Sequence, residues 1–393
     1  MTKTQTGNRV VIVGGGIFGC TAALELLSRG WSVSIVNPGG PPHEDASSTD
    51  VSKVVRMDYG SDVFYHELGE MAIEGWRCWN RDWPRPLYHE DGFLILSRGQ
   101  MRPGEYEYEN HHVLGQRGYD IPRLNMNLAS THYPAWDFSG YSDGYFNPTG
   151  GWVESGAVVE QVAKLCKNSG VQFYSGHMDQ LYSEGSRVSG VLTTDGNVIP
   201  GNIIVVAAGA WTPTLLPWLT DLLSPTGQPV LHFLPENPDL FRADRFPPWN
   251  SDIASSGWYG FPALSDGRVK VAHHGRGVSV HPDARGKVDV NHEIRAREFL
   301  ERAIPALSQA PIVYRRICMY CDAFDGNFLI GHDPSREGLV IASGGSGHAF
   351  KFAPVLGEII ADAVEHQPNK WGTRFAWRKA RAHASEEARY TGE

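Results

Sequence analysis

Two cysteines three residues apart, Cys318 and Cys321 in "RRICMYCD", could perform redox or metal chemistry. A redox dithiol usually starts a helix, because the helix dipole lowers the thiol pKa. This pair lies instead in a strand-like run. A structural zinc site would need two more ligands, and the sequence has no second C-x-x-C and no matching histidine pair. Spacing alone therefore leaves the role of these two thiols open.

A glycine loop is the second candidate for chemistry. The stretch "VVIVGGGIFG" fits G-x-G-x-x-G at Gly14, Gly16 and Gly19. It follows a β-branched run and opens a predicted helix, which is the context that the motif requires. The glycines allow a tight turn and let a pyrophosphate approach the helix N-terminus. The loop predicts a dinucleotide site; the alternative is an ordinary tight turn between a strand and a helix.

The second predicted strand ends in Asn37, where dinucleotide-binding proteins usually have an acidic residue. An amide can still hydrogen-bond a ribose hydroxyl, but without the strengthening that a charge gives. No Arg or Lys follows before Lys53, so nothing obvious would hold the 2′-phosphate of NADP. We expect the cofactor to be held in an additional way.

The elements that position these residues alternate between strand and helix at the start of the chain. A strand over 10–13, a helix over 17–28 and a strand over 33–36 form a unit of about 30 residues that requires a parallel sheet. The segment 102–150 has only a weak pattern. The other elements that we predict are helices over 62–81, 153–166, 290–303 and 353–364, strands over 88–97 and 339–342, and a strand pair turning at Asp195-Gly196.

The length of 393 residues predicts two domains. Segments of dinucleotide-binding type occur at the start, in the middle and at the end of the chain, and aromatic-rich segments separate them. We therefore predict an α/β fold in which a discontinuous Rossmann-like cofactor domain accompanies an α+β substrate domain with a mixed or antiparallel sheet. The predicted cofactor domain comprises 1–85, 151–225 and 315–393, and the substrate domain comprises 86–150 and 226–314.

Composition excludes several classes of partner. The net charge is −9 and no long run carries one sign, so neither nucleic acid nor an anionic membrane surface is expected to bind. No segment reaches the ~18 apolar residues of a membrane span, and the N-terminus lacks a secretory pattern. The odd count of five cysteines argues against a disulfide framework. We expect a cytoplasmic protein.

Motifs along nearly the whole chain resemble the monomeric sarcosine oxidase family of D-amino-acid-oxidase-like flavoproteins. Its members include pipecolate, saccharopine and fructosyl-amino-acid oxidases. The resemblance is weakest over 102–150, and "DVSKVVR" is closest to the fructosyl-amino-acid branch. The motifs that carry it are "DVSKVVR", "VVAAGAW", "WYGFP", "RVKVAHH", "CMY" and "GGSGHAFKFAP".

The resemblance implies FAD, held in a GR2-type Rossmann domain and bound covalently by a thioether from Cys318. An inert buried thiol remains the alternative for Cys318, and Cys321 would be a packed or flavin-lining thiol. A covalent link would also make one weakened contact at Asn37 tolerable. The residues that the resemblance assigns to cofactor binding are Gly14, Gly16, Ile17, Phe18, Gly19, Asn37, Ser47, Ser48, Lys53, Met178, Ala208, Gly209, Trp211, Cys318, Gly345, Gly347, His348 and Lys351.

The same resemblance implies the substrate site. Arg56 and Lys351 match the two cations that bind a substrate carboxylate, and Lys270 matches the lysine that activates oxygen. In "RVKVAHH" the strand alternation places Lys270 on the opposite side from Val269 and Val271. His274, Tyr259 and Tyr320 match residues that line the substrate pocket. No metal site is expected.

The implied reaction is oxidation of the C–N bond of a secondary amino acid to an imine, with O₂ reduced to hydrogen peroxide. The partners would be a small amino acid that carries a carboxylate and O₂, and the resemblance implies a monomer. Two alternatives stay open, namely a flavin dehydrogenase that passes electrons to a carrier, and a flavin-binding protein without catalysis. The sequence does not indicate the N-substituent.

Overall fold

The structure is a computed structural model, and it describes residues 8–392. It divides into two compact units, each built from three segments of the chain. The segment 52–85, assigned above to the cofactor domain, belongs to the second unit; which unit carries which function remains a prediction. Unit 1 comprises 1–51, 154–225 and 319–385, and unit 2 comprises 52–153, 226–318 and 386–393.

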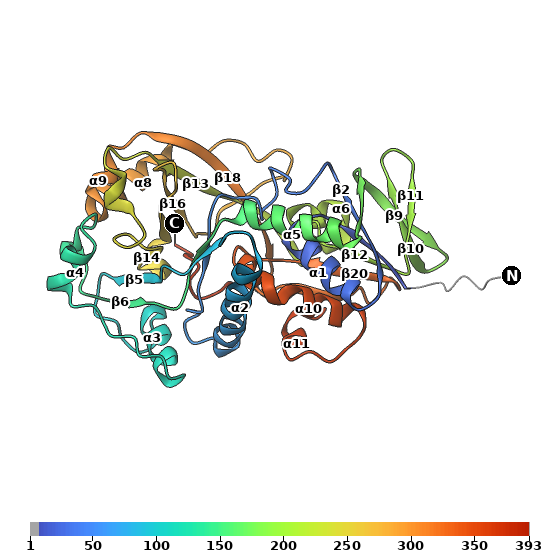
Figure 1. Ribbon diagram of the computed structural model, residues 1–393, viewed down its shortest axis with the longest axis horizontal. Helices are drawn as coiled ribbons and strands as arrows, with labels where there is room; N and C mark the ends of the chain where they lie inside the picture. The colour runs from blue at the N-terminus through green and yellow to red at the C-terminus, as the bar shows by residue number, and fades with distance from the viewer. Residues whose placement is uncertain (1–7, 393) are drawn as a thin grey trace. The chain divides into compact units, whose positions relative to one another are not determined.

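Unit 1 is built on a six-stranded sheet whose central strands run parallel (Figure 1). Helix α1 (Ile17–Ser28) packs against α5 (Ser155–Ser169) and α10 (Ala353–Val364). The α/β fold class is thereby confirmed for the cofactor-type segments. In spatial order the strands are β19 (Leu329–His332), β20 (Leu339–Ser343), β12 (Ile203–Val206), β1 (Arg9–Val13), β2 (Ser32–Asn37) and β8 (Gln172–Ser175).

A small antiparallel sheet and several short helices complete unit 1. The predicted turn at Asp195-Gly196 is confirmed, since Gly196 has φ +84° between two paired strands. The strands are β9 (Met178–Glu184), β10 (Arg187–Thr193) and β11 (Val198–Pro200), and the short helices are η2 (Gly209–Trp211), α6 (Thr212–Leu215), η3 (Pro217–Leu219), η5 (Ala349–Phe352) and α11 (Gly372–Phe375).

Unit 2 contains the predicted mixed sheet. From β17 to β6, neighbouring strands pair antiparallel except for β5 and β14, which run parallel. The order is β17 (Val278–Ser279), β13 (Leu223–Phe233), β16 (Val269–His273), β15 (Trp258–Ala263), β14 (Trp249–Ser251), β5 (Phe93–Ser97) and β6 (Asp143–Asn147), with β18 (Ile312–Ala323) beside β13. A second sheet consists of β3 (Lys53–Val55), β7 (Gly151–Val153) and β4 (Tyr88–His89).

The helices of unit 2 differ in how well the sequence predicts them. Helix α8 (Val290–Ala303) has the predicted bounds, whereas α3 (Tyr106–Gln116) was not predicted. The reason is that α3 buries Glu107 and Asn110, so its inner face is no apolar stripe. The remaining helices are α2 (Val63–Asp82), α4 (Met126–His132), η1 (Phe138–Gly140), η4 (Pro238–Phe241), α7 (Ile253–Ser256) and α9 (Pro305–Ser308).

The prediction of one strand over 88–97 was wrong. The structure has β4 and β5 there, and Gly92 between them adopts φ +78°, which interrupts an extended backbone. A side chain at Gly92 would also collide with the Phe146 ring, 2.2 Å from a Cβ atom. The break therefore has both a conformational and a steric cause.

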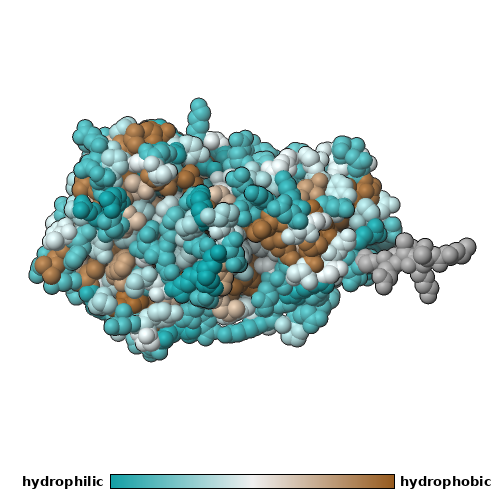
Figure 2. Space-filling model, in the orientation of Figure 1, coloured by the Kyte–Doolittle hydropathy of each residue, from teal (hydrophilic) through white to brown (hydrophobic). Residues whose placement is uncertain are grey.

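Each unit has its own hydrophobic core. In unit 1 the core lies between the parallel sheet and the small sheet and includes Val11, Val206 and Ile341. In unit 2 it lies between the mixed sheet and α8 and includes Trp249, Val271 and Phe299. In the view of Figure 2, hydrophobic residues form small groups separated by hydrophilic ones. Within residues 8–392, no helix is long and apolar enough to cross a membrane.

Candidate active site

Three loops of unit 1 meet at the carboxyl edge of its parallel strands. They follow β1, β12 and β20, which are neighbours in the sheet. The loops carry Gly14–Gly19, Ala207–Trp211 and Gly344–His348. In open α/β sheets this edge is where ligands bind. Three of the motifs that the sequence singled out are thus collected at one edge, although more than 300 residues separate the first from the last.

At two positions of the first loop, no residue other than glycine fits. Gly14 has φ +108°, and a Cβ atom there would lie 2.5 Å from the carbonyl oxygen of Ala207. A Cβ atom at Gly19 would lie 1.9 Å from the carbonyl oxygen of Gly14. The glycines therefore let the loop fold tightly onto the start of α1, as the predicted motif requires.

Asn37 holds this loop through its side chain. Its Oδ1 accepts a hydrogen bond from the Gly15 N–H at 2.8 Å, and its Nδ2 donates to the carbonyl oxygen of Gly39 at 3.2 Å. The side chain is 6% exposed. The residue that replaces the usual acidic one thus has a local structural role. Whether it also contacts a ribose stays a prediction.

Two serines border the same loop. Ser48 Oγ accepts a hydrogen bond from the Ile17 N–H at 3.4 Å, and a Cβ atom at Gly16 would lie 3.0 Å from this oxygen. Ser47 Oγ is buried and has no hydrogen-bond partner among the described residues. An orphaned hydroxyl beside a glycine cradle at a helix N-terminus fits a bound phosphate-containing cofactor.

The glycine-rich turn before α10 is shaped by close contacts. Gly347 has φ +76°, and a Cβ atom there would lie 2.2 Å from the ring of Tyr320. The Ser346 N–H donates to the Cys321 carbonyl oxygen at 2.9 Å, and Ser346 Oγ accepts from the Ala323 N–H at 3.0 Å. These two hydrogen bonds therefore join the turn to the end of β18. It also approaches α1, because a Cβ atom at Gly345 would lie 3.8 Å from the Phe18 ring.

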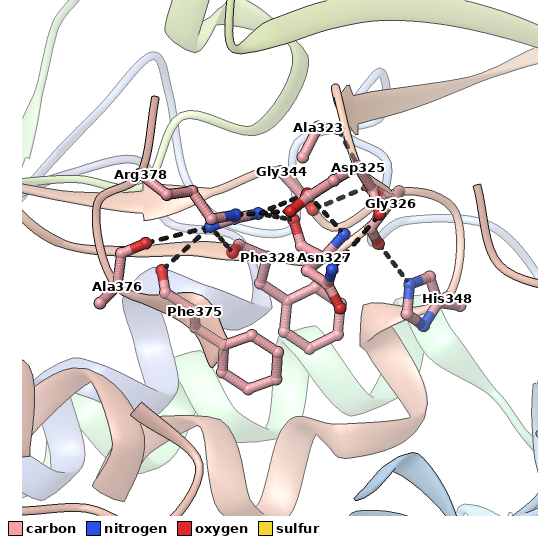
Figure 3. Close-up of polar contacts among 11 residues, drawn as sticks. Ala323, Asp325, Gly326, Asn327, Phe328, Gly344, His348, Phe375, Ala376 and Arg378 are labelled. Carbon is pink, nitrogen blue, oxygen red and sulfur yellow. Dashed lines mark hydrogen bonds and ion pairs between the residues drawn. The ribbon is translucent and has the colours of Figure 1, made fainter. Parts of the chain in front are cut away.

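An arginine holds the loop between β18 and β19, which adjoins this turn (Figure 3). Arg378 donates two hydrogen bonds of 2.6 Å to the carboxylate of Asp325, and its Nη1 donates to the Phe328 carbonyl oxygen at 2.9 Å. The neighbouring carbonyl oxygen of Gly326 lies 3.0 Å from Nε2 of the buried His348. Arg378 thus connects the segment after α11 to the loop between β18 and β19, and Gly326 of that loop contacts His348. No sequence pattern predicted this contact.

The other unit 1 residues assigned to the cofactor lie in or next to the same loops. Ala208 and Gly209 follow β12, and Trp211 contacts the His43 ring at 6.0 Å between centroids. Met178 is a buried residue at the start of β9. Lys351 lies in η5 and is only 6% exposed. Its burial excludes the alternative of a surface cation.

In unit 2, β16 presents different residues to its two sides, as predicted. Val269 and Val271 belong to the hydrophobic core. Lys270 points the other way, where its Nζ donates to the Ser52 carbonyl oxygen at 2.7 Å and lies 4.6 Å from the Phe261 ring centroid. It is 2% exposed. A lysine facing solvent is therefore excluded, while its role with oxygen stays a prediction.

The two cysteines lie in β18, as the strand-like pattern predicted, and both are free thiols. Residues three apart in a strand face opposite sides. Cys318 accordingly packs against Val230, Ala272 and Tyr259, whereas Cys321 belongs to the core of unit 1. Burial raises the pKa of Cys321 to about 11, which leaves it protonated at neutral pH. The geometry excludes a C-x-x-C dithiol.

Arg56 is a fully buried cation next to Glu386. Its Nη2 lies 3.9 Å from Glu386 Oε2, and its guanidinium lies 4.8 Å from the ring centroid of Tyr59. Its Nη1 is buried without a hydrogen-bond partner among the described residues. Burial lowers the pKa of Arg56, but Tyr106 and Glu386 outweigh this effect and raise it overall. Arg56 is therefore charged and has donor capacity for an anion.

His274 shares Glu386 with Arg56. Its Nε2 lies 2.6 Å from Glu386 Oε1, and both side chains are 7% exposed. Burial lowers the pKa of His274 below its usual value, although Glu386 partly opposes this. His274 is therefore neutral at pH 7. The neighbouring His273 faces the other side and contacts Trp258.

A carboxylate at Asp58 organises the tyrosines around Arg56. Asp58 Oδ1 accepts from the Tyr145 hydroxyl at 2.8 Å and Oδ2 accepts from Asn147 Nδ2 at 3.2 Å. The Tyr106 hydroxyl donates to the Asp58 carbonyl oxygen at 2.9 Å. Tyr259 lies on the sheet close to this group and packs with Tyr106 and Ala388.

Sequence reasoning missed Glu386, Asp58 and Ser52. Glu386 follows Arg56 by 330 residues, and no spacing rule connects them. Asp58 could have been suspected from its position two residues after Arg56. Lys53, which the resemblance assigned to the cofactor, is half-buried in β3 of unit 2.

Comparison with a family model decides the wider relationship. Residues 9–363 match the model of the family described as DAO, FAD dependent oxidoreductase. The chain belongs to this family. The predicted flavoprotein family is thereby confirmed, and so is FAD as the type of cofactor. The glycine cradle, the orphaned Ser47 hydroxyl and the helix N-terminus of α1 are the features of unit 1 that fit FAD.

Individual members of the FAD dependent oxidoreductase family resemble the chain over most of its length. Monomeric sarcosine oxidase from Bacillus sp. (strain B-0618) is 24% identical over 357 residues, 90% of either chain. N-methyl-L-tryptophan oxidase from Salmonella dublin is 24% identical over 360 residues, 90% of this chain and 93% of the relative. Fructosamine oxidase (Amadoriase II) from Aspergillus fumigatus has a similar structure, with TM-score 0.82 and 25% identity, covering 98% of this chain and 94% of that one.

Proposed function

We propose that this protein oxidises the C–N bond of a secondary amino acid and passes the electrons to O₂, which gives an imine and hydrogen peroxide. The observation that carries the proposal is Arg56, a buried cation with an unsatisfied donor at Nη1. Burying a cation is costly unless an anion compensates it; Glu386, 3.9 Å from Nη2, does so in part, and Nη1 still has no partner among the described residues. A substrate carboxylate would use this donor, since a guanidinium suits planar anions.

The relatives support a secondary amine as the substrate. The names of the similar enzymes mention sarcosine, N-methyl-L-tryptophan and fructosamine, and in each of these the nitrogen carries a substituent. Lys351, which is buried in unit 1, is assigned to the same carboxylate by the motif resemblance. Tyr259 and Tyr320 are assigned to the walls of the substrate pocket on the same ground.

FAD, when bound, supplies the two-electron oxidation, and the residues supply binding and charge. We assign its covalent attachment to Cys318, the thiol of β18 that packs on the unit 2 sheet. Lys270 provides a fixed positive charge screened from water, which would favour the transfer of electrons to O₂ over transfer to a carrier. None of the five cysteines, all of which lie among the described residues, is in a disulfide, which supports the proposed cytoplasmic location.

A substrate panel tests the proposal. N-methyl, cyclic and N-fructosyl amino acids are incubated in air with the FAD-loaded protein, and peroxide release is measured. We expect at least one class to release peroxide and its decarboxylated amine to be a poor substrate. Equal rates for the amine and the amino acid would contradict the carboxylate assignment. Flavin bleaching under anaerobic conditions without peroxide in air would indicate a dehydrogenase, and no bleaching by any compound would contradict catalysis.

Arg56 has a matched control. Arg56→Met should lower kcat/KM. The expected loss of transition-state stabilisation is a few kcal/mol, the scale for removing one charge from a closed site. Arg77→Met removes an exposed arginine that pairs with Glu90 in the same unit and should leave kcat/KM unchanged. If both variants behave alike, the loss reflects net charge rather than a carboxylate contact.

A further inference from the structure

Two cysteines of unit 1 that no motif singled out are neighbours next to the glycine loop. Cys20 lies in the first turn of α1 and Cys166 in the last turn of α5, and both side chains are fully buried between these packed helices. Cys166 Sγ donates to the Cys20 carbonyl oxygen at 3.3 Å, and the two thiols also interact directly. The fold therefore brings these two sulfurs together, although 146 positions separate the residues in sequence.

The Cys20 thiol also holds the glycine loop. Its Sγ donates to the Gly15 carbonyl oxygen at 3.3 Å. On the other side of the same residue, the Gly15 N–H donates to Asn37 Oδ1 at 2.8 Å. One side chain thus binds the N–H of Gly15 and another binds its carbonyl oxygen. Cys20 can donate only while it carries its S–H hydrogen, so oxidation of this sulfur would remove one of the two contacts.

We propose that hydrogen peroxide oxidises Cys20 and Cys166 to a disulfide, and that this disulfide weakens FAD binding at the glycine loop. The inference rests on the proposed function for the source of the peroxide. One thiol, as its thiolate, attacks the peroxide and breaks the O–O bond, which gives a sulfenic acid and one water. The second sulfur then attacks the sulfenic sulfur, the S–S bond forms and a second water leaves. The two thiols together lose two electrons and two protons, and one peroxide is reduced to two waters.

The surroundings of the pair determine how fast this reaction is. The pKa of Cys20 is raised well above its usual value, first by the interaction with the Cys166 thiol and then by burial, whereas Lys167 lowers it. Cys20 is therefore protonated at neutral pH, and only a thiolate reacts with peroxide. We expect a slow reaction that inactivates the enzyme during sustained peroxide production and takes no part in a single turnover.

The other cysteines do not offer the same geometry. All five lie among the described residues, and none is in a disulfide. Cys318 and Cys321 face opposite sides of β18 and belong to different clusters. Cys78 lies in unit 2 on α2, is only half-buried, and accepts a hydrogen bond from Arg81 Nη2 at 3.0 Å. Cys78 is therefore the control for peroxide damage at a more accessible thiol.

The first readout is the disulfide itself. Wild-type holoenzyme is treated with hydrogen peroxide, the remaining thiols are alkylated, and the peptides are mapped by mass spectrometry without reduction. We expect one cross-linked peptide pair, joined through Cys20 and Cys166, that disappears after treatment with dithiothreitol. Cys78→Ala should give the same pair. If peroxide leaves both thiols unlinked, or converts them separately to sulfinic acids, the inference is overturned.

The second readout is the affinity for FAD, measured in Cys318→Ala so that the cofactor can be removed and titrated. After peroxide treatment we expect the Kd to rise about 5-fold, the scale of one lost hydrogen bond, and dithiothreitol to reverse the change. Adding Cys166→Ala keeps the contact between Cys20 and Gly15 but prevents the disulfide, so peroxide should no longer alter the Kd. Adding Cys78→Ala should leave the 5-fold change intact. An unchanged Kd in the cross-linked protein, or an equal rise with Cys166→Ala, overturns the effect on the loop.

Added peroxide separates this inference from the proposed function. With an amino acid that the substrate panel identifies, turnover in air should form the same cross-link, and catalase should prevent it. A cross-link that forms equally in the presence of catalase would show that released peroxide is not the oxidant. If no compound of the panel releases peroxide, the proposed function fails, whereas mapping and titration with added peroxide still decide whether Cys20 and Cys166 form the disulfide.

Discussion

At the scale of single residues, burial separates the candidate active-site cations from ordinary surface charges. Arg56, Lys270 and Lys351 are 5%, 2% and 6% exposed. Lys and Arg are almost never buried so completely unless a partner or a function compensates the loss of hydration. Their burial therefore supports these three cations as candidate active-site residues more strongly than their sequence motifs do.

Lys270 has a specific test in the reaction with oxygen. Lys270→Met should slow flavin reoxidation by at least ~100-fold, about 2.7 kcal/mol, because a buried cation stabilises the negative charge that builds up on oxygen. Anaerobic reduction by substrate should change far less. Stopped-flow measurement of both half-reactions checks this. Arg268→Met, on the same hairpin but paired with Asp266, is the control. Unchanged reoxidation would remove Lys270 from the mechanism and favour a dehydrogenase.

Cys318 and Cys321 form a matched pair for testing the covalent link. Acid-precipitated wild type should stay yellow, and a tryptic peptide with Cys318 should carry the flavin mass. Cys318→Ala should release its flavin or bind it weakly. Cys321→Ala should keep the link, because its thiol lies in another cluster and has a pKa of about 11. Complete release of flavin from the wild type would show that the link does not exist.

At the scale of elements, local patterns predicted several helices and turns but missed the break at Gly92 between β4 and β5. Helices α1, α8 and α10 have the predicted bounds, since the apolar spacing that identifies each of them is a local pattern. The glycine loop was predictable for the same reason. Helix α3 was not, because it buries Glu107 and Asn110 against partners distant in sequence. Glu386 escaped notice because a tertiary contact alone brings it to His274.

The glycine-rich turn before α10 gives a prediction at this scale. Gly347→Ala should destabilise the protein more than Gly30→Ala, although both glycines have positive φ, +76° and +86°. A Cβ atom at Gly30 meets open space, whereas one at Gly347 meets the Tyr320 ring. We expect about 1 kcal/mol for Gly30→Ala and about 1–3 kcal/mol more for Gly347→Ala from overpacking. Urea unfolding measures both, and equal losses would contradict the steric argument.

At the scale of the whole molecule, the two units are interleaved in sequence, and the predicted site residues are distributed over both of them. The prediction that unit 1 is the cofactor domain has a direct test. FAD is titrated into apo Cys318→Ala, and hydrogen exchange is compared with and without it. A ligand that binds only the native state adds stability by mass action. Protection should increase first over 12–19, 206–212 and 344–352. An increase confined to unit 2 would contradict the assignment.

The return of residues 386–390 to unit 2 has a consequence for the synthesis of the protein. Domains generally fold as units while the chain is being made, the N-terminal ones first. Unit 2 cannot follow this order, because Glu386 is translated after every segment of unit 1. During translation, the His274 turn and Arg56 exist without their carboxylate partner. A nascent chain interrupted before Glu386 would still contain every strand and glycine loop of unit 1, yet it would lack the carboxylate that joins Arg56 to His274.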